Sequence, residues 1–313
     1  MTGAAIMIVA LGMDALIGWP PRLYALIGHP VTWIGALIGA FDRWINLDGG
    51  DERARRIAGV ITAFVVIGIV TTFAWLAEAQ LPGGWRGAIL GGILAWPLIA
   101  MRSLREHVEA VAKPLVAGDL GAARRKVAMI VGRDPNQLDR EGVARAAIES
   151  LAENTSDGIV APVFWGAIFG LPGIAAYKAI NTLDSMIGHR NERYAAFGWA
   201  SARIDDVVNL IPARLTGLFF AIVSTRPRAA MATMWRDARQ HRSPNAGWPE
   251  AALAGALDIR LSGPRSYGAR EEKEPWVNPH AADPVPEDIG RALRLFQFVM
   301  LALALVVAVC ALI

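Results

Sequence analysis

Long apolar runs separated by polar segments dominate the chain. Four of them approach the length needed to cross a bilayer, and they lie at Gly3 to Trp19, Ile57 to Leu76, Trp85 to Met101 and Leu293 to Ile313. The first has no basic segment before it and no small-residue cleavage site after it, which favours a retained helix over a removed signal peptide. Val31 to Ile45 is shorter and predicts an amphipathic or partly inserted helix.

Arginines near these runs set the expected orientation. Arg53, Arg55 and Arg56 precede the second run, and Arg102 and Arg105 follow the third, whereas the turn between the two runs carries little charge. By the positive-inside rule the arginine-bearing ends face the cytoplasm, so we expect the N-terminus outside.

Two polar regions interrupt the membrane pattern. In Ser103 to Leu151 apolar residues recur every three or four positions, as in soluble helices, with Asp119 and Asp139 as expected N-caps. Arg226 to Arg294 is rich in proline, glycine and arginine. We therefore predict an all-α, polytopic integral membrane protein with helical cytoplasmic insertions. Its expected regions are N-terminal membrane helices at 1–101, a cytoplasmic helical insertion at 102–157, a central site-bearing membrane region at 158–225, a soluble segment at 226–290 and a C-terminal transmembrane helix at 291–313.

The central region carries polar clusters around a broken apolar run. The run from Ile159 to Tyr177 is interrupted by Gly170-Leu171-Pro172-Gly173, and both glycine and proline break helices. A re-entrant helical hairpin would bring the polar residues at its two ends together, whereas a single crossing would separate them by roughly 30 Å. We therefore predict the hairpin. Whether Val207 to Val223 crosses the membrane stays open.

The candidate residues fall into three clusters at helical spacing. The first holds Glu149, Glu153, Asn154 and Asp157, the second Lys178, Asn181 and Asp184, and the third Arg203, Asp205, Asp206, Asn209 and Arg214. Carboxylate and amide oxygens suit a hard cation such as Mg²⁺, and Lys and Arg neutralise the phosphates that it bridges. The same inventory suits zinc or copper poorly. The alternative interpretation is an intramembrane hydrogen-bonded network that holds helices together.

Composition narrows the class of protein. With 54% hydrophobic and 19% charged residues and a mean hydropathy of +0.36, the chain is too apolar for an ordinary soluble domain. The net charge of +3 comes mainly from arginines beside apolar segments, which favours loops at a membrane over nucleic-acid binding. The single cysteine, Cys310, excludes an intrachain disulfide and a CxxC redox site. No P-loop, kinase motif or GxSxG elbow occurs.

Long motifs spread over most of the chain resemble the CobD/CbiB family of membrane proteins. They read DALIGWPPRLYALIGHPVTWIG, ESLAENTSDGIVAPVFW, YKAINTLDSMIGHRNERY, ARIDDVVNLIPARLT and DARQHRSPNAGWPEAALAGALDIRLSGPRSYG, in that order. The resemblance implies an adenosylcobinamide-phosphate synthase of cobalamin biosynthesis. Such an enzyme joins (R)-1-amino-2-propanol O-phosphate, or free aminopropanol, to the f-side-chain carboxylate of adenosylcobyric acid at the expense of ATP, with Mg²⁺.

Spacing and chemistry then suggest individual roles as hypotheses. Glu153, Lys178 and Asp184 are the catalytic candidates. The metal candidates are Asp157, Asp184, Asp205 and Asp206. The substrate-binding candidates are Glu149, Asn154, Asn181, Arg190, Arg203, Asn209, Arg214, His241, Arg242, Asn245 and Tyr267.

Two other classes of function remain open. The same superfamily includes AmpE-like membrane regulators, and a broken hairpin also suits a corrinoid or phosphate transporter. The acidic, amide and lysine clusters disfavour the regulator, and the absence of two matching halves disfavours the transporter. We expect a bacterial-type cell (inner) membrane location with the site facing the cytoplasm, contact with membrane lipid and with other late cobalamin-pathway enzymes, and no nucleic-acid partner.

Overall fold

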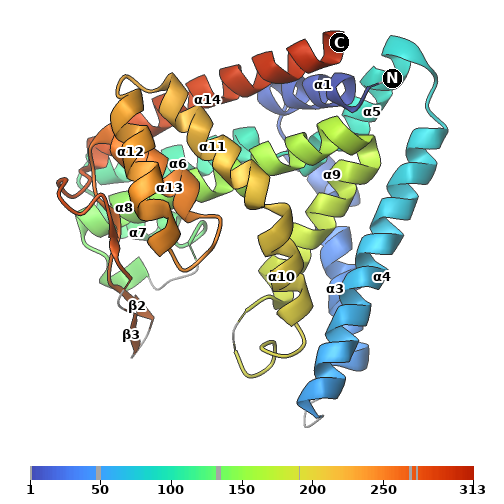
Figure 1. Cartoon of the computed structure of the whole chain (residues 1–313), viewed down its shortest axis with the longest axis horizontal. Helices are drawn as coiled ribbons and strands as arrows, with labels where there is room; N and C mark the ends of the chain where they lie inside the picture. Colours follow the sequence, from blue (N-terminus) through green and yellow to red (C-terminus); the bar gives the residue numbers. More distant parts are fainter. Residues whose placement is uncertain (1, 47–50, 132–134, 190, 268–269, 273) are drawn as a thin grey trace. The chain divides into compact units, whose positions relative to one another are not determined.

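The computed structural model of the chain is almost entirely helical (Figure 1). It describes residues 2–46, 51–131, 135–189, 191–267, 270–272 and 274–313, with the backbone alone at 265–267 and 270–272. The chain forms two compact units. Unit 1 comprises Met1–Ala100, Ala161–Asn209 and Val306–Ile313, and unit 2 comprises Met101–Val160 and Leu210–Leu305.

Unit 1 is a bundle of apolar helices. In chain order they are α1 (Gly3–Leu16), α2 (Pro21–Ile27), α3 (Pro30–Ile45), α4 (Glu52–Ala79), α5 (Gly84–Ala95), the 3-10 helix η1 (Trp96–Leu98), α9 (Ala161–Ile187) and α10 (Trp199–Val208). Helix α9 is central, because α1, α3, α4 and α10 all pack against it. Helices α3 and α4 run side by side (Figure 1).

One buried cluster joins these helices. It contains Ile38 from α3, Val66 from α4, Leu183 from α9 and Phe197 from the segment before α10, each with no exposed surface. Burying side chains of this size stabilises the fold by roughly 1.5–3 kcal/mol each. The cluster therefore holds the second half of α9 beside α10, the two elements that carry most of the predicted polar residues of this unit.

Unit 2 contains the remaining elements. Its helices are α6 (Met101–Val116), α7 (Leu120–Val127), η2 (Pro135–Gln137), α8 (Arg140–Thr155), the π-helical turn η3 (Ser156–Val160), α11 (Leu210–Val223), α12 (Pro227–Asp237), η4 (Ala238–Gln240), α13 (Gly247–Leu257) and α14 (Pro286–Leu312), the last reaching unit 1 beyond Leu305. Its strands are β1 (Leu261–Ser262), β2 (Arg265–Tyr267), β3 (Arg270–Glu272) and β4 (Trp276–Val277). Strands β1 and β4 pair antiparallel, as do β2 and β3. Helix α13 is buried along its whole length and packs on α8, α11 and α12.

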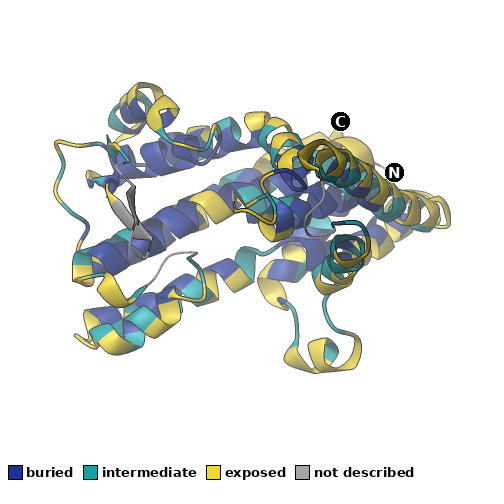
Figure 2. Ribbon diagram, turned by 90° about the horizontal axis from the view of Figure 1, so that it is seen from below, coloured by how far each residue is buried: buried dark blue, intermediate teal, exposed yellow. Residues whose placement is uncertain are grey.

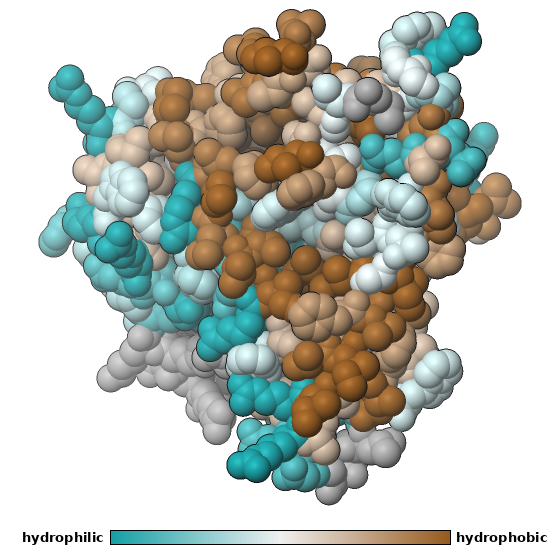
Figure 3. Space-filling view, turned by 45° about the vertical axis from the view of Figure 1, so that its right-hand side comes forward, coloured by the Kyte–Doolittle hydropathy of each residue, from teal (hydrophilic) through white to brown (hydrophobic). Residues whose placement is uncertain are grey.

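Five helical stretches among the described residues are long and apolar enough to cross a membrane, and a sixth is added if α10 and α11 count as one span. The five are Pro21–Ile45, Glu52–Ala79, Gly84–Val116, Arg140–Ile187 and Pro286–Leu312. Helix faces in these stretches remain exposed in the protein (Figure 2), and Figure 3 shows apolar side chains at the protein surface. The predicted all-α polytopic membrane class is therefore confirmed.

Several local predictions are confirmed and others shift. The side chains of Asp119 and Asp139 cap α7 and α8 by accepting hydrogen bonds from backbone N–H groups. The expected helix from Trp85 to Met101 ends as an α-helix at Ala95, because Pro97 has no N–H to continue it and a 3-10 turn follows. The predicted central region at 158–225 is divided by the unit boundary after Asn209.

Helix α9 is broken where the sequence predicts it. Gly170 adopts the left-handed conformation with φ of 67°, a conformation that costs other residues energy. Beyond the break Gly173 packs against the carbonyl oxygen of Trp165 so closely that a Cβ atom has no room. The freed N–H of Leu171 donates a 2.7 Å hydrogen bond to the Glu78 carboxylate of α4. The predicted interruption is confirmed, while its re-entrant placement in a bilayer stays a prediction.

The break yields a stability prediction. Replacing Gly170 by Ala should lower the melting temperature by several degrees, because a left-handed Ala costs roughly 1–2 kcal/mol and its Cβ would meet the Glu78 carboxylate. Gly68→Ala is the matched control, since Gly68 lies within α4 and a Cβ atom added there would meet no other atom within 4 Å; this variant should be neutral or stabilising. Thermal unfolding in detergent measures both, and equal melting temperatures would show that the break is not strained.

Candidate functional site

The polar residues of unit 1 come from two packed helices, α9 and α10. On α9, Tyr177, Asn181 and Asp184 recur at four- and three-residue spacing and so share one helix face. On α10, Asp205 and the C-cap residue Asn209 are four residues apart and share another. The local periodicity of the sequence thus places two polar faces in two elements that pack on each other.

A hydrogen-bonded chain joins these two faces. Tyr177 Oη donates to Asn209 Oδ1 at 2.9 Å, and Asn209 Nδ2 donates to Asp205 Oδ2 at 3.0 Å. Asp205 is only 9% exposed, and its Oδ1 atom is buried without a direct hydrogen bond from any described residue, although the Asn181 amide lies near enough to interact with this carboxylate. A buried carboxylate oxygen without a partner is costly, so this atom is suited to a ligand that carries positive charge or donates a proton.

Three carboxylates make this region strongly acidic. Asp205 interacts electrostatically with Asp184 and Asp206, and the Asn181 amide also contributes to its surroundings. Arg203 offsets part of the charge, since its guanidinium lies 3.3 Å from Asp206. We call Asp184, Asp205 and Asp206 the acidic cluster. Like charges so close together repel each other, and a bound cation would relieve that repulsion.

The acidic cluster fits Mg²⁺ held together with phosphate. Among the described residues no three His, Cys, Asp or Glu side chains are placed to hold a metal ion by themselves. Mg²⁺ usually binds through one or two carboxylates plus substrate phosphates and water, and only rarely in an all-protein cage. The unpartnered oxygen of Asp205 and the all-oxygen character of the cluster therefore fit this cation.

Lys178 is buried in unit 1 on the same turn of α9 as Tyr177. It is 8% exposed, and its charge interacts with the ring of His29. The imidazole of His29 accepts a 3.2 Å hydrogen bond from the Val31 backbone N–H and caps α3. His29 therefore has a structural role at the start of α3, and its ring also interacts electrostatically with a candidate catalytic lysine.

In unit 2, Glu149 belongs to a polar chain that runs through Ser262. Glu149 is 5% exposed and accepts a 2.6 Å hydrogen bond from the Ser262 backbone N–H. The Ser262 hydroxyl donates to Glu274 at 3.3 Å, and Glu274 lies 3.2 Å from the Arg242 guanidinium. The structure thus connects the predicted residues Glu149 and Arg242 through Ser262 and Glu274, neither of which was predicted.

A buried histidine and glutamate lie near the start of α13. His241 Nε2 is 3.7 Å from Glu250 Oε2, and both side chains are almost fully buried. His241 Nδ1 accepts a 3.1 Å hydrogen bond from the Ser243 N–H. Asn245 is buried in the same loop.

The other residues of the first cluster lie at the end of α8. Glu153 and Asn154 are exposed, and Asn154 donates to the Ser150 carbonyl at 2.9 Å. Asp157 is half-buried in the π-helical turn η3. Such π-helical turns occur frequently at functional sites. Glu149 and Glu153 are thus one helical turn apart but differ in exposure, although Thr155 and Ser156 beyond them are buried again.

A pair of arginines, Arg214 and Arg239, forms a cationic region in unit 2. The Arg214 guanidinium lies 4.3 Å from the centre of the Trp248 ring, and its Nη1 donates to the Leu210 carbonyl at 2.6 Å. Arg239 is close enough to Arg214 for their charges to repel. Because Arg guanidinium groups bind phosphate in a fork geometry, two adjacent arginines suit a phosphate anion. Arg239 was missed because spacing in the sequence does not connect η4 with α11.

The candidate residues divide between the two units. Lys178, Asn181, Asp184, Arg203, Asp205, Asp206 and Asn209 belong to unit 1, and Glu149, Glu153, Asn154, Asp157, Arg214, His241, Arg242 and Asn245 to unit 2. Arg190 and the Tyr267 side chain lie outside the described residues. That all three clusters form one site stays a prediction.

An aromatic and charged framework supports β4. Arg145 and Arg260 both lie over the Trp276 ring, at 4.7 and 4.3 Å from its centre. Both also pair with Asp283. Since Trp276 is the cross-strand partner of Ser262, this framework holds the serine that contacts Glu149.

Comparison with known proteins matches almost the whole chain. The family described as CobD/Cbib protein matches residues 7–296. A cobalamin biosynthesis protein CobD of Rhodobacter capsulatus is 62% identical over 99% of this chain and 98% of its own length. Proteins with the same description from Sinorhizobium sp and Klebsiella pneumoniae are 46% and 44% identical, over 93% and 96% of this chain and 93% and 95% of their own lengths. No solved structure matches the chain.

The framework around β4 predicts that the stability of the protein depends on pH. The hydrogen bond from Arg260, reinforced by Arg145, holds the pKa of Asp283 below its ordinary value. A carboxylate with a lowered pKa in the folded state stabilises the protein above its unfolded pKa of about 3.9, and this contribution is lost as pH falls through the folded pKa. Asp283→Asn should therefore destabilise the protein at pH 6 and have less effect below about pH 4.

Melting temperatures at several pH values measure this difference. Glu192→Gln, which changes an exposed carboxylate, is the control and should show little effect at either pH. A pH-independent effect of Asp283→Asn would contradict the charge-based explanation.

Proposed function

The chain belongs to the CobD/CbiB family, which places it in cobalamin biosynthesis, and we propose that it is an ATP-dependent ligase of that pathway. Its substrates are adenosylcobyric acid and (R)-1-amino-2-propanol O-phosphate, and its product is adenosylcobinamide phosphate. The observation that carries the proposal is the acidic cluster of unit 1, in which a buried oxygen of Asp205 has no partner among the described residues.

The reaction needs activation of a poor electrophile. A carboxylate does not condense with an ammonium group in water, so the f-side-chain carboxylate first attacks the γ-phosphorus of ATP, releasing ADP and forming an acyl phosphate. The free amine then attacks the acyl carbon, the C–N bond forms, phosphate leaves and the amine proton passes to a base. A protein catalyses such steps by positioning the reactants and by stabilising charge on the phosphate oxygens.

Unit 1 supplies the groups expected to handle Mg-ATP. Asp184 and Asp205 are the proposed Mg²⁺ ligands, with Asp206 beside them, and Asn181 and Asn209 orient the carboxylates. When bound, Mg²⁺ would draw charge from the phosphate oxygens and align the γ-phosphate for transfer. Lys178, buried on α9, is proposed to neutralise the charge that develops on the transferred phosphoryl group.

Unit 2 supplies the groups expected to hold the amine substrate and the corrinoid. Arg214, together with Arg239, is proposed to bind the phosphate of aminopropanol phosphate. His241, Arg242 and Asn245 are proposed to contact the corrinoid. Glu153, which is exposed at the end of α8, is the proposed base for the amine, with Asp157 as an additional metal candidate.

Location and partners are part of the same proposal. Five or six apolar helical stretches in the described part of the chain identify a membrane protein. The arginines at 53, 55 and 56, before the apolar core of α4, favour a cytoplasmic position for that end. We propose a bacterial-type inner membrane location, with the reaction on the cytoplasmic side, where ATP and the other late pathway enzymes are found.

The first test measures how a substitution in the acidic cluster changes the activity of the protein. Asp205→Asn keeps the volume and removes the charge, so it should lower kcat by roughly 100-fold or more and raise the Mg²⁺ concentration needed for half-maximal rate. Glu52→Gln removes an exposed carboxylate of the same unit, outside the quoted motifs, and should leave both values unchanged. Mass analysis of the corrinoid and ADP measurement provide the readout. Normal turnover by Asp205→Asn, or the absence of product from the wild-type protein, would contradict the proposed ligase function.

The second test concerns the arginine pair. Arg239→Gln should raise the KM for aminopropanol phosphate by roughly 10–100-fold, the value of a lost charge-assisted hydrogen bond. The KM for free aminopropanol should not change, because that substrate has no phosphate to bind. An equal effect on both substrates would show that the arginine supports the fold instead of binding the phosphate.

A further inference from the structure

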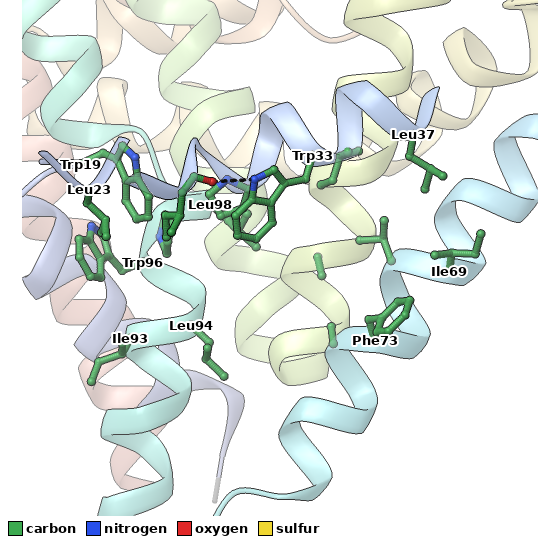
Figure 4. Close-up of a pocket in the computed structure, with 17 residues that line it drawn as sticks. Trp19, Leu23, Trp33, Leu37, Ile69, Phe73, Ile93, Leu94, Trp96 and Leu98 are labelled. Atoms are coloured by element: carbon green, nitrogen blue, oxygen red, sulfur yellow. Dashed lines mark hydrogen bonds between the residues drawn. The ribbon is translucent and has the colours of Figure 1, made fainter. Parts of the chain in front are cut away.

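An apolar pocket of about 650 Å³ lies within unit 1, apart from the acidic cluster (Figure 4). Its size falls in the range of about 300–1,000 Å³ typical of ligand pockets. Side chains from α2, α3, α4 and α5 and from the segment after α5 line it, among them Leu23, Trp33, Phe73, Leu94 and Trp96. None of the residues that line it is charged.

Two of the three tryptophans that line the pocket donate their N–H groups to backbone carbonyls of the protein. Trp33 Nε1 donates to the Ile27 carbonyl at 2.9 Å, the bond drawn in Figure 4. Trp96 Nε1 donates to the Gly18 carbonyl at 3.0 Å, whereas the buried Nε1 atom of Trp19 has no hydrogen-bond partner among the described residues. The pocket therefore offers a ligand almost no hydrogen-bonding group. It is suited to hydrocarbon and unsuited to water or a polar metabolite.

The walls of the pocket indicate where that hydrocarbon comes from. They belong to Pro21–Ile45, Glu52–Ala79 and Gly84–Val116, three of the stretches that are apolar enough to cross a membrane. Phe73 lines the pocket and is still 70% exposed in the protein alone. A pocket with such walls is next to acyl chains in a bilayer, and filling it with an acyl chain restores dispersion contacts that an empty space would lack.

Helix α2 provides the second observation. It has no buried residue, and its Leu26 is 80% exposed while Leu23 and Ile27 line the pocket. A short helix with so little protein around its apolar side chains is typical of the membrane interface. Arg22 is exposed on the same helix, one position before Leu23, and its guanidinium matches a phosphate group.

We propose that this pocket is a binding site for a membrane phospholipid, with one acyl chain between α3, α4 and α5 and the headgroup phosphate at Arg22. The lipid packs against Ala175 of α9, three residues before Lys178. It thus supports the second half of α9 from the side of the apolar pocket. The site is independent of the proposed ligase reaction.

Photo-cross-linking tests the site directly. The full-length protein is reconstituted in vesicles of phosphatidylcholine and phosphatidylglycerol that contain a phosphatidylglycerol probe with a diazirine on its acyl chain, and labelled peptides are mapped by mass spectrometry. Ala74→Phe fills the pocket from α4 and should lower labelling of the α3 and α5 pocket peptides at least fivefold. Thr72→Phe adds the same ring to an exposed position of α4 that does not line the pocket, and should leave that labelling unchanged.

Val70→Phe is a second pocket-filling variant from the same wall, for use if Ala74→Phe does not fold. Undiminished labelling in a folded pocket-filling variant would overturn the proposal, because the label would then report only lipid around the protein. Arg22→Gln removes the guanidinium that is proposed to bind the headgroup phosphate and should lower labelling by the phosphatidylglycerol probe, whereas unchanged labelling in this variant would contradict the role of Arg22.

Discussion

The hydrogen bond from the Leu171 N–H to the Glu78 carboxylate is the contact on which unit 1 depends. A helix that breaks at Gly170 leaves backbone N–H and C=O groups without their intrahelical hydrogen bonds. Each unsatisfied group costs about 1–3 kcal/mol in an ordinary protein interior, and several kcal/mol in the apolar surroundings of a membrane. A carboxylate at the start of the second half of α9 satisfies one of them and interacts favourably with the positive end of the helix dipole. The direction of that half helix in turn sets where Tyr177 and Asp184 lie.

The same half helix gathers charges that would otherwise not be stable together. The Tyr177–Asn209–Asp205 chain orients one carboxylate of the acidic cluster and leaves its second oxygen buried and unpartnered among the described residues. Such an arrangement costs folding energy, and proteins often place strained or under-satisfied groups where a ligand completes them. A cation bridging to phosphate is the ligand whose chemistry matches this cluster of oxygen atoms.

Sequence patterns predicted what depends on near neighbours along the chain. The break at Gly170, the N-caps Asp119 and Asp139 and the polar face of α9 follow from propensity and helical spacing. Contacts between distant segments did not follow. Glu78 accepts a hydrogen bond from an N–H group that lies 93 residues away along the chain, and Ser262 lies 113 residues from Glu149. Glu78 ends an apolar stretch, and Ser262 lies in one of the quoted motifs, but neither stretch shows its distant partner. Periodicity identifies the face of a helix but not the segment that packs on it.

The most direct test of the proposed chemistry follows an oxygen atom. Adenosylcobyric acid labelled with ¹⁸O in its f-side-chain carboxylate is incubated with the purified protein, Mg-ATP and aminopropanol phosphate, and the released phosphate is analysed by mass spectrometry. Activation as an acyl phosphate predicts that each inorganic phosphate carries one ¹⁸O atom and that one phosphate forms per amide bond. Amide formation with unlabelled phosphate, or with the label in AMP, would contradict the proposed phosphoryl transfer at the carboxylate.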